Sequence, residues 1–256
     1  MRYRPCITAA ALLGFGTLFG IHYARAAELK LLSAAAMKSA FVELLPQFEQ
    51  ATGHRVIVEY GTTAGFRPRI EGNEPFDVAV IVQTATEELV RSGRLLQDPR
   101  PVIGITVASL VYKSGTPKPD IATPEAFKTT LLGAAKISLS DPSLGGTSSI
   151  YFINVVKRLG LDNAINEKFI ITKSGAGATP VVEGSAQYGV ALTSEIAGVA
   201  GISGVPIFPS DPASTTTLAA SISSVSIQPE AARAFIAFLV SPEAIAVRRA
   251  KGLVPD

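Results

Sequence analysis

The sequence has 256 residues, of which 47% are hydrophobic and 17% charged, and its formal net charge is +2 at neutral pH. One cysteine and two histidines are too few for a disulfide scaffold or a Cys/His zinc site. The nearly balanced charge argues against a surface that binds nucleic acid.

The first 26 residues are typical of a secretion signal. Arg2 and Arg4 form a basic start, residues 7–21 form an apolar stretch, and residues 24–26 match the small-residue cleavage pattern A-x-A. The apolar stretch is shorter than the roughly 20 residues that span a bilayer. We therefore expect residues 1–26 to be a cleaved signal peptide and the mature protein to be periplasmic, beginning near Ala27. An uncleaved N-terminal membrane anchor is the alternative.

Removal of this segment changes the bulk properties. Arg2, Arg4 and Arg25 leave with it, so the remainder carries a net charge of −1, which is +2 less 3. Cys6 and one histidine leave as well, so the remainder has no thiol. About 230 residues remain, which is 256 less 26, and this length suits one large α/β domain or two lobes.

In the first half of the chain, strand patterns alternate with helix patterns. Strands are expected at 29–32, 55–60, 77–82 and 102–112, and helices at 37–52, at a short stretch ending near 71, and at 84–92. Pro46 is expected to kink the first helix or restart it. This alternation predicts an α/β sheet.

The pattern restarts after a turn-rich stretch at 117–124, which suggests a second lobe. Helices are expected at 125–132, 147–159, 180–186, 194–199, 229–240 and 242–251, and strands at 136–139, 169–172, 188–192, 205–208 and 218–225. Residues 209–217 are expected to form a linker.

Four strand-to-helix turns are rich in small hydroxyl residues and glycine. They lie at 33–36, 60–67, 145–149 and 174–179. Such turns leave backbone N–H groups unpaired at a helix start, where the helix dipole also favours an anion. Four of them in one chain predict a shared anion site.

Several short motifs along the mature chain are shared with one protein family. They are Ala34-Ala35-Ala36-Met37, Gly61-Thr62-Thr63, Ile70-Glu71-Gly72, Pro75-Phe76-Asp77-Val78, Ser140-Asp141-Pro142, Gly189-Val190-Ala191 and the ending from Phe235 to Ala244. With these motifs the chain resembles bacterial periplasmic solute-binding proteins, and in particular the molybdate-binding branch of the type II family.

The resemblance implies a fold and a partner. The fold is α/β, the two-lobed type II periplasmic binding protein fold, with mixed sheets flanked by helices and the ligand in a cleft between the lobes. The implied protein is a monomer that closes around its ligand by a hinge motion and docks on the permease of an ABC importer. With crossing strands near 105–109 and 208–218, lobe 1 comprises residues 27–105 plus 217–256 and lobe 2 comprises 106–216.

The resemblance also implies ligand-binding residues. The expected ligand-binding residues are Ser33, Ala36, Thr62, Thr63, Arg67, Thr147, Ser148, Gly175 and Gly177, of which Arg67 is expected from its charge near the cleft and not from the resemblance. Molybdate or tungstate is the first expected ligand. Relatives that hold molybdate use a serine where this chain has Ala36 and a tyrosine where it has Leu192, and Arg67 adds a cation that suits a carboxylate or phosphate. An organic carboxylate or a phosphorylated metabolite is therefore the alternative.

Catalysis is not expected. A Ser-His-Asp triad would have to use His54, which follows a helix stop, and no acid lies within the four turns. No P-loop lysine follows the glycines. We expect no cofactor, no metal other than molybdenum within a bound oxyanion, and no nucleic-acid partner; a periplasmic enzyme is the remote alternative. Because backbone amides do not titrate near neutral pH, affinity for a ligand that does not titrate should change little between about pH 6 and 8.

Overall fold

The computed structural model describes residues 26–173 and 175–254. The expected signal peptide lies outside these residues, apart from Ala26. Within the described ranges, no helix combines the length and the apolar character needed to cross a membrane. Strands are β1 Glu28–Ala34, β2 Arg55–Gly61, β3 Val78–Val82, β4 Val102–Lys113, β5 Ile137–Ser140, β6 Phe169–Thr172, β7 Tyr188–Leu192, β8 Ile202–Pro206 and β9 Thr215–Ile222. Helices are α1 Lys38–Thr52, α2 Thr63–Glu71, α3 Gln83–Arg91, α4 Pro124–Gly133, α5 Thr147–Arg158, α6 Asp162–Ile165, α7 Thr179–Glu183, α8 Thr193–Ile196, α9 Pro229–Leu239 and α10 Pro242–Ala250.

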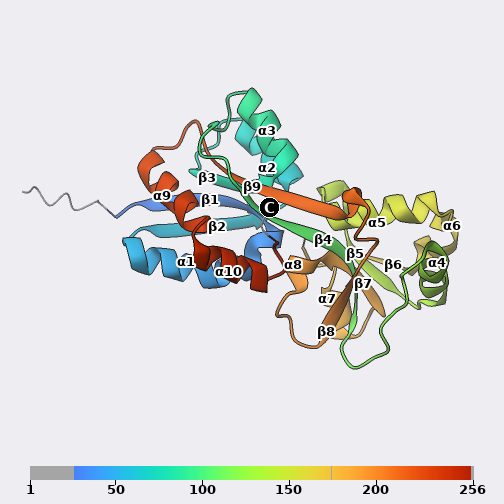
Figure 1. Ribbon diagram of the computed structural model, residues 1–256. Helices are drawn as coiled ribbons and strands as arrows, with labels where there is room; N and C mark the ends of the chain where they lie inside the picture. Colours follow the sequence, from blue (N-terminus) through green and yellow to red (C-terminus); the bar gives the residue numbers. More distant parts are fainter. Residues whose placement is uncertain (1–25, 174, 255–256) are drawn as a thin grey trace, which may run out of the picture.

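The strands form a mixed sheet in the order β2-β1-β3-β9-β4-β7-β5-β6, and β8 also pairs with β4. β1 is parallel to β2 and β3, and β5 is parallel to β6 and β7, whereas β9 runs antiparallel to β3 and β4. Figure 1 shows helices on both sides of the strands in each half of the molecule. The fold is therefore α/β, as the alternating sequence pattern predicts.

Strand β4 belongs to both halves of the molecule. It pairs with β9 through Val107 and with β7 from Ala108 onward. Figure 1 shows β4 and β9 running between the half that contains β1 to β3 and the half that contains β5 to β8. The change of partner falls within the stretch 105–109, where a crossing between lobes is expected. The lobe boundaries themselves stay a prediction.

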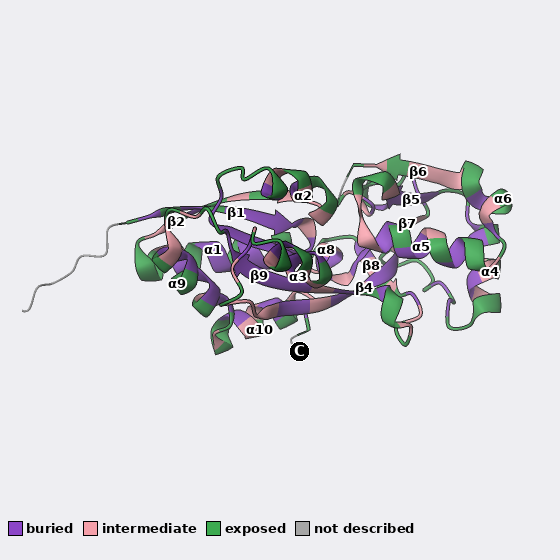
Figure 2. Cartoon of the chain, turned by 90° about the horizontal axis from the view of Figure 1, so that it is seen from above, coloured by how far each residue is buried: buried purple, intermediate pink, exposed green. Residues whose placement is uncertain are grey.

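The apolar core is divided in the same way. In the first half, one group of buried residues lies between the sheet and helices α1, α9 and α10, with Phe41, Phe48 and Phe235 among them, and a second group includes Phe66. In the second half, Phe127 belongs to the main group. Figure 2 shows buried strands covered by helices whose outer faces are exposed. Strands covered on both faces need continuous apolar runs, which explains the sequence of β3.

Several expected elements differ from those in the structure: α6 is not among the expected helices, and α7 and α8 each end three residues earlier than expected. Pro46 does not restart the first helix: α1 continues to Thr52 with Pro46 on its exposed side. The carbonyl group that loses its partner there belongs to Val42, which is also exposed, so water can replace the lost hydrogen bond. β8 and β9 each begin three residues earlier than expected, because pairing with β4 sets their bounds. The expected linker at 209–217 thus ends where β9 begins.

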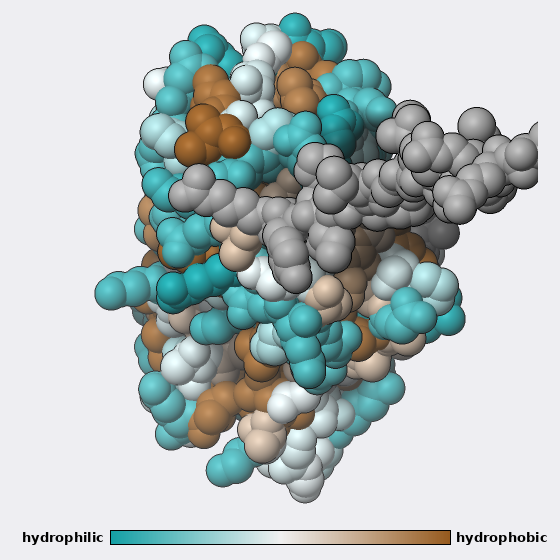
Figure 3. All heavy atoms as spheres, turned by 90° about the vertical axis from the view of Figure 1, so that its left-hand side faces the viewer, coloured by the Kyte–Doolittle hydropathy of each residue, from teal (hydrophilic) through white to brown (hydrophobic). Residues whose placement is uncertain are grey.

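The surface carries scattered apolar residues rather than one large patch on the face that Figure 3 shows. Small brown groups alternate there with hydrophilic residues. Among the described residues, exposed side chains such as Ile227 (86%) and Val42 (66%) are isolated examples, and single exposed apolar residues are normal on soluble domains.

Candidate anion-binding site

A small cavity lies between the two halves of the molecule. Its walls come from the ends of β1, β2 and β3, the start of α5, and the segment around α8. Its volume is about 40 Å³, which exceeds the roughly 10–15 Å³ that one water molecule needs and suits a compact ion. Larger cavities exist elsewhere in the described residues, among them one of about 590 Å³ beside Phe208. The small cavity is the one at which the strand-to-helix turns meet.

Three threonines in the cavity wall each accept one hydrogen bond from the protein through the side-chain Oγ1. The Oγ1 of Thr62 accepts from the N–H of Gly65 at 3.0 Å, and that of Thr63 accepts from the N–H of Val82 at 3.1 Å. The Oγ1 of Thr147 accepts from the hydroxyl of Thr216 at 2.8 Å. A hydroxyl has one hydrogen to donate, and none of these three hydrogens is used in those bonds. Each threonine is thus oriented by the protein and can donate to an anion.

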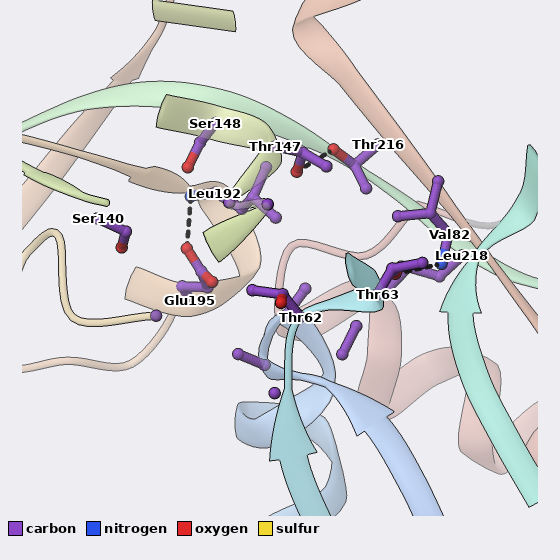
Figure 4. A pocket seen from close by; sticks show the side chains of 17 residues that line it. Thr62, Thr63, Val82, Ser140, Thr147, Ser148, Leu192, Glu195, Thr216 and Leu218 are labelled. Atoms are coloured by element: carbon purple, nitrogen blue, oxygen red, sulfur yellow. Dashed lines mark hydrogen bonds between the residues drawn. The ribbon is translucent and has the colours of Figure 1, made fainter. Parts of the chain in front are cut away.

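Two serines add further hydroxyl groups. Ser140 and Ser148 line the cavity and each is only 6% exposed. Neither side chain donates or accepts a hydrogen bond within residues 26–173 and 175–254. Figure 4 shows them on the same side of the pocket as Glu195, with Thr62 and Thr63 on the opposite side. Their hydroxyl groups are therefore free to donate to, or accept from, a molecule in the cavity.

Glu195 is the residue in the cavity wall that titrates. It stands on the short helix α8, and its Oε2 accepts a hydrogen bond from the backbone N–H of Leu192 at 2.9 Å. The residue keeps partial solvent exposure because it faces the cavity, yet protein surrounds the carboxyl group on its other sides. This burial raises the pKa of Glu195, and the hydrogen bond from Leu192 opposes that effect without cancelling it.

The two halves approach each other closely beside the cavity. A Cβ atom built on Gly145 would lie 2.5 Å from the Cβ of Ala64, and one built on Gly175 would lie 3.1 Å from the Cβ of Ala35. Both glycines also have positive φ angles, +81° and +71°. Glycine is therefore required at Gly145 for two reasons, the backbone conformation and the contact across the cavity.

The structure brings six of the nine expected ligand residues to the cavity. They are Ala36, Thr62, Thr63, Thr147, Ser148 and Gly175. Their roles in binding stay a prediction.

The other three lie elsewhere. Ser33 is fully buried in β1 and its hydroxyl donates to the carbonyl of Ala34. The guanidinium of Arg67 is exposed and pairs with Glu71 at 2.8 Å and with Glu88 at 2.5 Å, so two acids on the surface occupy it. Gly177 packs against β7, where an added Cβ would overlap the carbonyl oxygen of Val190.

Sequence reasoning missed three polar residues of the cavity. Ser140 stood in a motif already noted for its resemblance, and its place at the end of β5 is the position where a parallel strand presents side chains to a ligand. Glu195 follows β7 in a fifth strand-to-helix turn, outside the four that glycine and hydroxyl residues indicate. Thr216 lies in the stretch expected to be a linker, and only its pairing in β9 reveals its position.

The chain matches the family model of bacterial extracellular solute-binding proteins over residues 29–254. This chain belongs to that family. It is 31% identical over 233 residues to aconitate isomerase from Pseudomonas sp, covering 89% of this chain and 87% of that protein. It is 28% identical over 180 residues to the molybdate-binding protein ModA of Azotobacter vinelandii, covering 68% of each.

Solved structures of the family show the same fold. The periplasmic molybdate-binding protein of Azotobacter vinelandii has a TM-score of 0.74 at 22% identity, covering 89% of this chain and 99% of that one. The sulfate-binding protein SubI of Mycobacterium tuberculosis H37Rv has a TM-score of 0.69 at 21% identity, and the match covers 90% of this chain and 87% of that one. The resemblance to periplasmic molybdate-binding proteins and the type II fold are both confirmed.

Proposed function

We propose that this protein is a periplasmic receptor that binds a small anion in the cavity between its halves and delivers it to the permease of an ABC importer. The observation that carries the proposal is the set of threonine hydroxyls. Thr62, Thr63 and Thr147 all accept hydrogen bonds from the protein and keep their own hydrogens for a ligand. Such an arrangement favours an acceptor-rich solute, and oxyanions are rich in acceptors.

Neutral donors are strong enough for this task. A hydrogen bond to a charged group contributes about 1.5–3 kcal/mol, so five to seven of them give roughly 8–20 kcal/mol before the ordering of ligand and side chains is subtracted. Micromolar to nanomolar affinity needs about 8–12 kcal/mol. The cavity of about 40 Å³ suits a tetrahedral oxyanion better than a long solute, and molybdate or tungstate leads on resemblance.

A small organic acid is the alternative ligand, and the cavity gives it specific support. Ala36 and Leu192 line the cavity and provide apolar methyl groups where the molybdate-binding relatives have hydroxyl groups. Val82 and Leu218 add to this apolar surface. Arg67 does not support this alternative, because Glu71 and Glu88 pair with its guanidinium at the surface. Carbon atoms of a ligand would pack against the apolar wall while its carboxylate met the hydroxyls.

An isomerase acting on a small organic acid is a second candidate function. It is favoured by Glu195, a carboxyl group in the cavity that could accept and return a proton, and by the similarity to a protein named aconitate isomerase. Incubation with cis-aconitate and with trans-aconitate, followed by proton NMR, tests it. Interconversion of the two isomers by the wild type, abolished in the variant Glu195→Gln, would support an enzyme. Unchanged substrate would contradict the enzyme and leave the receptor as the proposed function.

A thermal-shift titration, confirmed by calorimetry, tests the receptor. The panel contains molybdate, tungstate, sulfate, phosphate and small mono-, di- and tricarboxylates. A ligand that binds only the folded state raises stability with the logarithm of its concentration over Kd. Shifts with molybdate and tungstate alone would identify a metal-oxyanion receptor, and shifts with carboxylates alone an organic-acid receptor. No shift with any member would contradict the proposal.

A further inference from the structure

An ionised carboxyl group does not belong in an anion site that neutral donors form. Glu195 lines the cavity together with Ser140 and Ser148. Its side chain is half-buried, with Oε2 bonded to the N–H of Leu192 and Oε1 beside Gly175. If Glu195 were ionised, a bound oxyanion would lie beside a second negative charge with little water between them, and repulsion across such a site is strong. If Glu195 carries a proton, it becomes one more donor toward the same ligand.

The surroundings offer no cation that would hold Glu195 in its ionised form. The helix α8 packs against α1, the turn at Ala35–Met37, β4, β7 and β8. The segment at Gly175 also lies beside the carboxyl group. The titratable side chains of these elements, of the adjoining end of α10 and of the residues next to Gly175 are Lys38, Glu43, Glu49, Tyr112, Lys113, Lys173, Tyr188, Arg248, Arg249 and Lys251. None of them forms a hydrogen bond or an ion pair with Glu195 in the described part of the chain.

The charges closest to the site in sequence have other contacts. Lys38 lies over the ring of Tyr60, with its Nζ 5.9 Å from the ring centre. Glu43 pairs with Lys251, and Glu49 accepts from the backbone N–H of Val56. The carboxyl group of Glu195 therefore has one backbone donor and an anion cavity as its polar surroundings.

Helix capping explains only part of this geometry. Glu195 occupies the third position of α8 and accepts the N–H of Leu192, as residues in a capping box do. That contact uses one lone pair of Oε2. A capping side chain that pointed to solvent would serve α8 equally well, whereas this carboxyl faces the cavity. Its second function must come from what the cavity holds.

We propose that Glu195 binds the ligand as a neutral carboxylic acid and donates a hydrogen bond to it, so that a fully ionised anion binds together with one proton. This inference rests on the proposed anion receptor and specifies the ligand class that it prefers. An oxyanion without a proton of its own, such as molybdate, needs a protonated Glu195, so its affinity falls above the pKa of Glu195, in contrast to the nearly constant affinity expected from backbone donors alone. A ligand that keeps a proton above neutral pH, such as hydrogenphosphate, can instead share it with an ionised Glu195. As pH rises, the site therefore favours phosphoryl ligands that carry a proton over metal oxyanions and fully ionised carboxylates.

The test is calorimetry of molybdate and inorganic phosphate across about pH 6 to 9, in pairs of buffers with different ionisation enthalpies. Molybdate stays fully ionised over this range, so any proton that the complex takes from the buffer is bound by a group of the protein. For the wild type we expect uptake of up to about one proton per molybdate and a Kd that weakens toward roughly tenfold per pH unit above the pKa of Glu195. Phosphate, which supplies a proton, should weaken less steeply.

The matched variant is Glu195→Gln, which keeps the length of the side chain, an acceptor for the N–H of Leu192 and a donor for the ligand. It should bind molybdate with no proton uptake and with an affinity that does not change with pH. Molybdate binding without proton uptake in the wild type above the pKa of Glu195, or the same pH slope for molybdate in the variant, would overturn the inference while leaving the receptor intact. Binding of neither anion would overturn both. If the variant does not fold, proton uptake by the wild type decides.

Discussion

Replacement of Gly145 by alanine should separate the two halves of the protein at the cavity. The new Cβ would lie 2.5 Å from the Cβ of Ala64, whereas carbon atoms in contact lie about 3.5–4.0 Å apart. The start of α5 must therefore move away from α2 by about 1–1.5 Å. Thr147, the first residue of α5, would move with it.

The expected loss of affinity follows from this displacement. A hydrogen bond near 2.9 Å that lengthens by about 1 Å no longer meets the geometric limits of a hydrogen bond. Loss of one bond to a charged ligand removes about 1.5–3 kcal/mol, which is roughly a ten- to hundredfold increase in Kd. Calorimetry with the anion identified by the thermal-shift panel would measure it.

Gly115→Ala is the matched control. Gly115 also has a positive φ angle, +85°, but a Cβ there meets no atom within 4 Å. Both variants share the penalty of about 1–2 kcal/mol for alanine in a left-handed conformation, so unfolding measurements should show both destabilised. Only Gly145→Ala should bind more weakly. Equal affinity of the two variants would refute the argument that contact between Gly145 and Ala64 accompanies ligand binding.

Three further outcomes are expected. The double variant Thr63→Val with Thr147→Val should lose about 3–6 kcal/mol of binding free energy, which raises Kd roughly a hundredfold or more. The control Thr129→Val, whose hydroxyl donates to the carbonyl of Glu125, should bind with normal affinity. Unchanged affinity of the double variant would place the site elsewhere. Burial raises the pKa of Glu195 above its ordinary value of 4.5, so the stability that this carboxyl group contributes is fully present below that value and is lost as pH rises through the raised pKa. Over this window the free energy of unfolding of the wild type should fall relative to that of Glu195→Gln. Parallel pH profiles of the two unfolding free energies would contradict this expectation. Asp77 is 5% exposed and accepts hydrogen bonds from the N–H of Lys30 at 2.8 Å and from the hydroxyl of Ser226 at 2.6 Å. Asp77→Ala should therefore lower the free energy of unfolding, measured in urea, by about 2–4 kcal/mol. The control Asp120→Ala, in an exposed turn, should change it by less than about 1 kcal/mol.

The two halves of the site differ in how readily sequence reveals them. Thr62 and Thr63 could be predicted because they follow an alternating strand and begin a helix, and both signals are local. Thr147 was accessible in the same way at the start of α5. Arg67 was equally conspicuous in sequence, but Glu88, 21 residues away on α3, holds its guanidinium at the surface. A charged side chain is placed by whichever partner the fold brings near, and sequence spacing does not give that partner.

The sequence by itself determined the order of strands and helices and the turns at which an anion could bind, because periodicity and turn chemistry depend on residues within a few positions of one another. Only the tertiary structure decided which of those turns meet. Pairing of β4 with both β7 and β9 brings Glu195 and Thr216 to the cavity, whereas Ser33, in a strand paired on both sides, remains buried. These placements depend on contacts between distant segments, and the same contacts put a carboxyl group, unseen in the local pattern, into an anion site.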